Sequence, residues 1–345
     1  MGKLQKINNE IIDSDDLEFF RSIAELIQNA RYEVERQVNT VMVVTYFEIG
    51  RRIIEKEQKG AKRAQYGKKI MQGLSDFLTE HLGKGYSIQN LKLMRRFYVV
   101  YSEQFGQSAI NQFNTNVTWT HYILLTRINN SDERRFYEIE IAENNWSFRE
   151  FERQFDSALY ERLALSRNKK KVRELATKGQ IVKTPQDLFK DPYVLEFTGL
   201  PEKAEYTETQ LEQKLIDHLQ HFLLELGKGF SFVGRQVRFT YEEESFYVDL
   251  VFYNRLLKSF VLVDLKIGKL KNYDIGQMQM YVNYYDRIVK LPDENPTIGI
   301  VLCRDKKAAV VEMMLPIDNK QIFAAKFETV LPSKNELRKL LEAND

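Results

Sequence analysis

The most informative part of the sequence is Ser245-Phe-Tyr-Val-Asp-Leu-Val-Phe-Tyr-Asn-Arg-Leu-Leu-Lys-Ser-Phe-Val-Leu-Val-Asp-Leu-Lys266. It holds two apolar runs typical of buried strands, and these runs contain Asp249, Asp264 and Lys266. Residues two apart in a strand share a face, so Asp264 and Lys266 point the same way. Burying even a neutral polar group without a partner costs roughly 2–7 kcal/mol, so we expect these side chains to bind a metal, form ion pairs or take part in a reaction. The runs cover residues 245–253 and 258–266.

A helix upstream is expected to add a fourth charged side chain, Glu212. Residues 207–226 carry apolar side chains at the period of a helix, and Glu212 lies beside this stripe. The glutamate should therefore point into the same interior as the two strands. The apolar positions are Leu211, Leu215, Leu219, Phe222 and Leu226.

Converging carboxylates of this kind suit Mg²⁺ or Mn²⁺, which bind one or two carboxylates, several waters and a substrate phosphate. A bound metal lowers the pKa of its water, and a nearby ammonium group stabilises the charge that develops on phosphorus. The residues therefore predict a phosphodiesterase site. An Asp-x-Lys pair alone is also typical of a simple salt bridge on a sheet face, so the prediction depends on all four side chains.

The order Glu212, Asp249 and Asp264-Leu265-Lys266 resembles the PD-(D/E)xK nuclease superfamily. Longer strings are similar to the bacterial YhcG-like nuclease family, and the resemblance covers roughly residues 20 to 340. Two positions depart from the family pattern: Val248 stands where proline is usual, and Asp264 stands where glutamate is commoner. The similar strings lie at residues 191–197, 222–236, 246–253 and 276–281.

The resemblance implies a role for each residue of the candidate site. It makes Glu212, Asp249 and Asp264 ligands of Mg²⁺, with Mn²⁺ as the other suitable ion, and Lys266 the catalytic lysine. It also places Gln277 and Tyr281, a Gln-x-x-x-Tyr pair, on a helix beside the site. A glutamine and a tyrosine one turn apart are otherwise ordinary helix neighbours.

The segments after Lys266 predict the rest of an α/β domain. Helix, meandering strands, helix, strand and helix in this order indicate an α/β/α sandwich around a mixed sheet, which is the arrangement of the nuclease superfamily. We place this domain at residues 193–345 and a basic linker at residues 166–192. The further helices are expected at 272–288, 306–315 and 333–343, and the further strands at 297–303 and 322–326.

Residues 1–165 predict an all-α domain that binds DNA or serves oligomerisation. Residues 17–56 carry apolar positions at helical spacing without a proline, which indicates a long helix pair or one bent helix. Residues 64–82 and 88–98 predict two helices joined by a glycine turn, with Ser87 as the N-cap. This pair fits a helix-turn-helix DNA-binding motif, and it fits equally an ordinary antiparallel pair of an all-α domain.

Basic and amide side chains in this half are the candidates for DNA contact. The second helix of the pair would present Gln89, Asn90, Lys92, Arg95 and Arg96 to DNA. The cluster Lys169, Lys170 and Lys171 is either a phosphate contact or a solvated helix end.

Charge and composition support a two-domain protein that acts on nucleic acid. The chain has 345 residues with a net charge of +2. Residues 1–180 hold 29 Lys and Arg against 24 Asp and Glu, whereas residues 181–345 hold 22 against 25. No apolar run is long enough to span a membrane and no signal core begins the chain, so we expect a cytoplasmic protein. The single cysteine, Cys303, lies in an apolar strand and is expected in the core.

The predicted function is a metal-dependent deoxyribonuclease that hydrolyses DNA phosphodiester bonds in DNA repair, restriction or defence against foreign DNA. The alternative is a DNA-binding or complex-assembly protein whose nuclease fold is inactive. The sequence holds no Walker-type phosphate loop, so a motor or recognition subunit would be another polypeptide. A homodimer is expected, because one site cuts one strand and the apolar positions of residues 17–56 are too many for one buried stripe.

Overall fold

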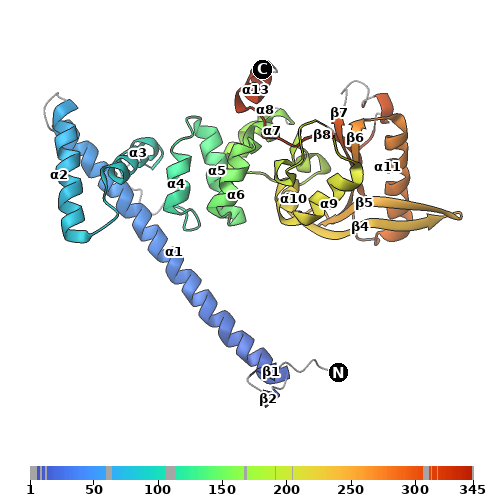
Figure 1. Ribbon diagram of the computed structural model, residues 1–345, viewed down its shortest axis with the longest axis horizontal. Coiled ribbons are helices and arrows are strands. Elements are labelled where there is room, and N and C mark those ends of the chain that lie inside the picture. The colour runs from blue at the N-terminus through green and yellow to red at the C-terminus, as the bar shows by residue number, and fades with distance from the viewer. Residues whose placement is uncertain are drawn as a thin grey trace. The chain divides into compact units, whose positions relative to one another are not determined.

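The computed structural model consists of two compact units, which we describe in turn (Figure 1). One unit comprises Met1–Arg134 with Glu138–Phe151, and the other comprises Arg135–Tyr137 with Glu152–Asp345. The domain limits predicted from the sequence stay a prediction. The structure describes residues 6–7, 10–11, 14–59, 64–105, 113–166, 169–190, 192–203, 205–305, 311, 313–316 and 318–343.

The first unit is built on one long helix, α1, which spans Ser14–Lys59. The helix is continuous where the sequence left a pair of helices open. Its second half buries Val43, Phe47 and Ile53, and it packs closely against helix α3. Gly50 allows this approach, because a Cβ atom there would lie 2.2 Å from the Met94 carbonyl oxygen.

Besides α1, this part of the chain forms short elements that are mostly helical, and α3 and α4 enclose an aromatic core with α1. Phe97 lies at its centre, with its ring centroid 4.9 Å from Tyr122 and 5.4 Å from Trp119. The predicted helix pair at 64–82 and 88–98 is confirmed, and its second helix runs on to residue 105. The elements are β1 (Lys6–Ile7), β2 (Glu10–Ile11), α2 (Ala64–Leu82), α3 (Ile88–Phe105), α4 (Trp119–Leu125), α5 (Ser131–Asn144) and α6 (Phe148–Asp156).

The second unit contains a six-stranded mixed sheet with the order β3-β8-β7-β6-β5-β4. Strands β4, β5 and β6 form an antiparallel meander, while β6, β7, β8 and β3 run parallel. The strands are β3 (Tyr193–Val194), β4 (Phe230–Tyr241), β5 (Glu244–Asn254), β6 (Ser259–Lys269), β7 (Ile298–Asp305) and β8 (Ile322–Glu328). The helices are α7 (Leu159–Leu165), α8 (Lys169–Lys178), α9 (Glu208–Asp217), α10 (Leu219–Leu226), α11 (Asn272–Tyr284) and α13 (Lys334–Ala343), with short helical turns η2 (Pro185–Leu188), η3 (Glu196–Thr198) and η4 (Tyr285–Val289).

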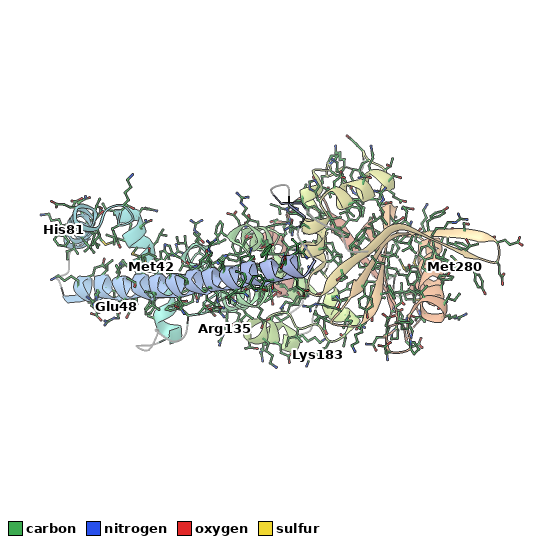
Figure 2. All side chains as sticks on the ribbon, turned by 90° about the horizontal axis from the view of Figure 1, so that it is seen from below. Met42, Glu48, His81, Arg135, Lys183 and Met280 are labelled. Atoms are coloured by element: carbon green, nitrogen blue, oxygen red, sulfur yellow. The ribbon has the colours of Figure 1, made fainter. Side chains whose placement is uncertain are left out.

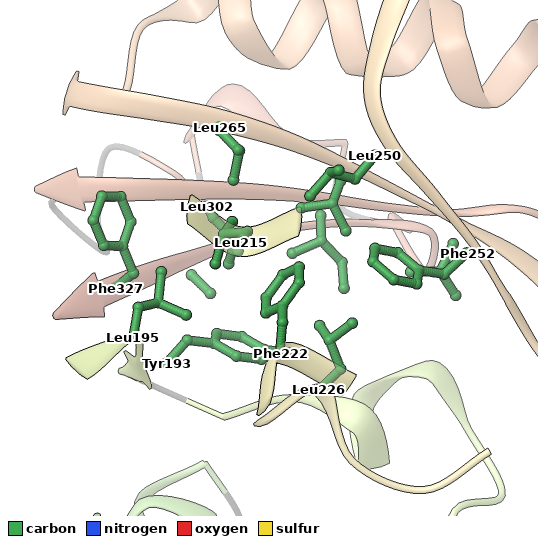
Figure 3. Close-up of a cluster of buried hydrophobic side chains, with 14 of the residues drawn as sticks. Tyr193, Leu195, Leu215, Phe222, Leu226, Leu250, Phe252, Leu265, Leu302 and Phe327 are labelled. Atoms are coloured by element: carbon green, nitrogen blue, oxygen red, sulfur yellow. The ribbon is translucent and has the colours of Figure 1, made fainter. Parts of the chain in front are cut away.

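Alternation along the strands gives the sheet two apolar faces, and each face is covered by helices. On one face Phe222 and Leu226 of α10 point toward Leu250 and Phe252 of β5, as Figure 3 shows. On the other face α11 packs against the central strands and buries Met278. Helices, sheet and helices therefore form three layers, and the predicted α/β/α sandwich is confirmed.

Two local features differ from or add to the sequence prediction. The helix expected over 207–226 breaks at His218, so α9 and α10 are separate helices. Residues 169–178 of the predicted linker form α8. Residues 306–310 and 312 of the helix predicted at 306–315 lie outside the described residues. Cys303 is buried in β7, as predicted. No helix among the described residues combines the length and the apolar character needed to cross a bilayer.

Candidate active site

The candidate site lies where two neighbouring strands separate. Pairing between β5 and β6 ends at Leu250 and Val263, whereas β6 stays paired with β7 from Val261 to Lys269. The Asp249 carboxylate replaces the backbone acceptor that β5 would otherwise provide, because its Oδ2 accepts a hydrogen bond from the Leu265 amide at 2.8 Å. The sheet thus opens a gap at which Asp249 is fixed against the backbone of β6.

Asp264 and Lys266 project from β6 into this gap on one face of the strand. Lys266 Nζ lies 2.7 Å from Asp264 Oδ2, and Asp264 is only 2% exposed. Burial and the nearby Asp249 carboxylate together raise the pKa of Asp264 to about 7. Burial alone would lower the pKa of Lys266, but the Asp264, Glu208 and Asp249 carboxylates together outweigh burial and raise that pKa. The lysine therefore keeps its charge beside the acids.

Glu212 reaches the same place from α9. It is 5% exposed, and burial followed by the Asp249 charge raises its pKa, although the amide of Gln236 opposes the shift. A capping box between Thr207 and Gln210 fixes the start of α9. Glu208 Oε1 also accepts a hydrogen bond from the Ile267 amide of β6 at 3.2 Å. The first turn of α9 is thereby attached to the strand that carries Asp264.

Gln277 and Tyr281 meet on α11, where the Gln277 amide donates to the Tyr281 hydroxyl. Tyr281 is buried, and its burial together with the Asp264 and Asp249 charges raises its pKa to about 12. The phenol therefore lies within the electrostatic influence of the acids and stays protonated at neutral pH.

Two residues of β4 also belong to the site, and sequence reasoning missed them. The Gln236 amide donates to Glu212 Oε2 at 2.5 Å and to Asp249 Oδ1 at 3.1 Å. Arg235 Nε lies 3.3 Å from Glu212 Oε1. Both residues end one of the strings similar to the family, but nothing in their types or spacing indicates that both contact one carboxylate.

The donor set fits a hard divalent cation. Glu212 Oε1 and Asp264 Oδ2 are buried and have no well-aligned hydrogen-bond donor among the described residues. Arg235 Nε lies 3.3 Å from the first oxygen and Lys266 Nζ lies 2.7 Å from the second. Within the described ranges, no three His, Cys, Asp or Glu side chains converge closely enough to hold an ion alone. Mg²⁺ commonly uses one or two carboxylates and completes its shell with water and phosphate oxygens. One or two of the Asp264, Asp249 and Glu212 carboxylates would therefore supply the protein oxygens.

The candidate DNA contacts on α3 are only partly available. Arg95 forms an ion pair with Glu57 at 2.8 Å, and Arg96 Nε donates to the Thr126 carbonyl oxygen at 3.1 Å. Arg95 therefore connects α3 to α1, and Arg96 connects α3 to the end of α4. The contact of the five α3 side chains with DNA stays a prediction.

The remaining candidates divide in the same way. Gln89 and Lys92 are exposed on α3, whereas the Asn90 amide donates to the Gly85 carbonyl oxygen of the preceding turn. Lys171 pairs with Asp187 at 2.9 Å. The side chains of Lys169 and Lys170 lie outside the described residues.

The chain is similar to known nuclease sequences over most of its length. Residues 186–342 match the YhcG PDDEXK nuclease domain, and residues 22–162 match the DUF1016 N-terminal domain. The protein named Putative nuclease YhcG from Escherichia coli (strain K12) is 38% identical over 341 residues, which cover 91% of this chain and 90% of that protein. The chain belongs to the YhcG family. The resemblance drawn from the sequence is thereby confirmed, and the sheet unit is a PDDEXK nuclease domain.

Two solved structures are similar to parts of the chain. A repair endonuclease from Pyrococcus abyssi is 14% identical, with 38% of this chain and 50% of that chain covered at a TM-score of 0.26. The EndoMS-dsDNA2 complex is 16% identical, with 39% and 49% covered at a TM-score of 0.26. These TM-scores are too low to support a fold assignment, which therefore rests on the strand order of the sheet and on the family match.

Proposed function

We propose that this protein is a Mg²⁺-dependent deoxyribonuclease that hydrolyses phosphodiester bonds of DNA. The observation that supports this proposal most is the buried Asp264 carboxylate. Lys266 Nζ lies 2.7 Å from it, and burial together with the Asp249 charge raises its pKa. A protein that only binds DNA gains nothing from clustered, desolvated carboxylates, whereas a metal-dependent hydrolase needs them.

The residues of the site divide the chemical work. When bound, Mg²⁺ would supply a water of lowered pKa and polarise the phosphate. Asp249, Asp264 and Glu212 would hold the ion. Lys266, which is mostly buried and keeps its charge, would hold the attacking water and stabilise the charge developing on the phosphate oxygens. Tyr281 remains a hydrogen-bond donor, because its pKa is about 12.

The proposal is tested by incubating the purified chain with plasmid, linear duplex, single-stranded and branched DNA. We expect cleavage with Mg²⁺ or Mn²⁺ and none with EDTA. Binding of DNA without any cleavage, at every metal tested, would instead support the alternative of an inactive nuclease fold in a binding or assembly protein. The pathway, whether repair, restriction or defence, and any recognition or motor subunit would follow from the DNA form that is cut.

We also propose that the helical half increases the affinity for DNA through exposed side chains of α3. Lys92 and Gln89 are exposed, and residues 1–180 carry the basic excess of the chain. Replacing Lys92 with Gln should weaken binding on all sequences and lower the slope of log affinity against log salt by about 1. Arg52→Gln, an equal charge change on α1, is the control. Filter binding at several salt concentrations measures the slope, and equal slopes for Lys92→Gln and wild type would remove α3 from the DNA interface.

The first half of α1 supports a further proposal, that two copies of the chain pair. The half that holds Met42 and Glu48 (Figure 2) packs within its unit, whereas residues 18–35 are exposed all round. From Phe20 to Val41, apolar side chains nevertheless recur every seven residues. This is the repeat of a coiled coil, and it fits an identical helix of a second copy. The repeat consists of Phe20, Ile27, Val34 and Val41, which are 48%, 48%, 61% and 63% exposed.

Pairing is expected to give a dimer at micromolar concentration, which would bring two sites to the two strands of a duplex. The double variant Ile27→Asp, Val34→Asp should be a monomer, because burying its carboxylates without partners in the interface between the two helices would be unfavourable. Val99→Asp changes an exposed apolar residue of α3 and serves as the control. Sedimentation of the intact chain decides the question: a wild-type monomer, with and without DNA, would refute pairing and leave nicking as the expected activity.

A further inference from the structure

Strand β4 contains a residue with a backbone conformation that strands do not normally use. Gln236 has φ +47°, in the left-handed region, between Arg235, which pairs with Leu250, and Val237, which pairs with Val248. This conformation is unfavourable for any residue with a Cβ atom. It persists where the surrounding structure holds it, commonly at functional sites.

The irregularity changes the direction of a side chain. In a regular strand, neighbouring side chains point to opposite faces. Here Arg235 and Gln236 both reach the Glu212 carboxylate, with Arg235 Nε 3.3 Å from Oε1 and Gln236 Nε2 2.5 Å from Oε2. The backbone twist at Gln236 therefore allows two consecutive residues to contact one carboxylate, as irregularities in strands near active sites often do.

The Gln236 amide also connects two acids that come from different elements. Its Nε2 contacts Glu212 of α9 and Asp249 of β5, which lies 3.1 Å away. With the Leu265 amide on Asp249 Oδ2, hydrogen bonds from aligned donors occupy Glu212 Oε2 and both Asp249 oxygens. Glu212 Oε1 and Asp264 Oδ2 are buried oxygens of the site that have no aligned donor among the described residues, and each has a cationic side chain nearby.

We infer that Gln236 is a positioning residue that orients Glu212 and Asp249 and so determines which carboxylate oxygens remain open to a divalent cation. This inference rests on the proposed metal-dependent function. A neutral amide suits the task, because its two N–H groups can serve two carboxylates at once and it adds no negative charge. Partners that orient metal-binding side chains typically change metal affinity by about 10–100-fold when they are removed.

The test uses the full-length chain and Mn²⁺ as the probe. Gln236→Gly keeps the left-handed backbone and removes the amide, and Glu243→Gly makes the same kind of change at φ +70° in the turn that joins β4 to β5. Gln236→Asn keeps a shorter amide and tolerates the conformation. We expect thermal unfolding temperatures of the glycine variants to equal or exceed the wild-type value.

Mn²⁺ affinity, followed by calorimetry or by the electron paramagnetic resonance of the free ion, should fall about 10–100-fold in Gln236→Gly. It should fall less in Gln236→Asn and stay unchanged in Glu243→Gly. Equal Mn²⁺ affinity of Gln236→Gly and wild type would overturn this inference alone. A wild-type chain that binds Mn²⁺ and cuts no DNA would overturn the proposed function alone. Absence of Mn²⁺ binding by wild type would overturn both.

Discussion

Asp264→Asn and Lys266→Ala should each reduce Mg²⁺-dependent DNA cleavage by on the order of 10²–10³-fold or more, because each removes a charge from the reacting centre. The two variants should differ in metal binding. Asp264→Asn removes an anionic oxygen and weakens Mn²⁺ affinity, whereas Lys266→Ala removes a competing cation and leaves that affinity intact. Asp217→Asn, an exposed acid at the end of α9, is the control and should keep full activity. Full cleavage by Asp264→Asn would contradict the assignment of the site.

Asp264→Asn should also stabilise the fold, although it reduces cleavage. Burial and Asp249 raise the pKa of Asp264 to about 7 in the folded chain, compared with about 3.9 when unfolded. The folded state therefore binds the extra proton between these values, and stability falls as pH rises from about 4 to about 7. In EDTA, Asp264→Asn should remove this decline and unfold at higher urea concentration than wild type at pH 8. Equal urea midpoints at pH 8 would mean that Asp264 carries no such cost.

The sequence predicted the relative placement of Asp264 and Lys266 better than it predicted the structure around them. Alternation along 258–266 placed Asp264 and Lys266 on one face because a strand has a fixed period of two. The break at His218 was not foreseen, because the apolar stripe continues through it. The role of Gln236 could not be foreseen either, since a left-handed glutamine has no local sequence signature. In these cases tertiary contacts decided the local structure.

The partners of the two α3 arginines could not be predicted from the sequence for a related reason. Periodicity identified the outer face of the helix, but it could not identify which basic residues on that face have partners elsewhere. Arg95 meets Glu57, which lies 38 positions away in the sequence, and such pairs are not visible from spacing along one helix. Lys92 and Arg96 are both exposed, so the contacts of Arg95 with Glu57 and of Arg96 with the Thr126 carbonyl oxygen, and not exposure, set the two arginines apart.

Glu225→Gln should destabilise the nuclease unit by on the order of 3–5 kcal/mol, because it leaves buried cations without their counter-charge. Glu225 of α10 and Arg162 of α7 are both fully buried, with Arg162 Nη1 2.5 Å from Glu225 Oε1. The Val194 amide donates to the same oxygen at 3.0 Å, and Arg153 Nη2 lies 3.6 Å from Oε2. Although burial acts to raise it, Arg162, Lys190 and Arg153 hold the pKa of Glu225 at about 2.

Urea unfolding of the two single variants Glu225→Gln and Glu328→Gln measures this effect. Glu328 pairs with Lys326 at 3.0 Å on the surface, so its loss should cost less than about 1 kcal/mol. The depressed pKa means that the contribution of Glu225 is present above its unfolded pKa of about 4.3 and is lost as pH falls toward 2. Equal midpoints for both variants at pH 7 would show that the buried network adds no more than a surface pair.

This network also bears on where the folding unit of the nuclease begins. The match to the nuclease domain starts at residue 186, and the sequence alone suggested residue 193, yet the counter-charge of Glu225 comes from Arg162. A fragment that starts at 193 lacks Arg162, Arg153 and Lys190, so Glu225 would be buried without its cations and protonation would become its cheapest state. Fragment 152–345 should therefore unfold cooperatively in urea, whereas fragment 193–345 should resemble Glu225→Gln or fail to fold. A fragment 193–345 as stable as 152–345 would place the network outside the folding unit and remove the reason for the large effect expected at Glu225.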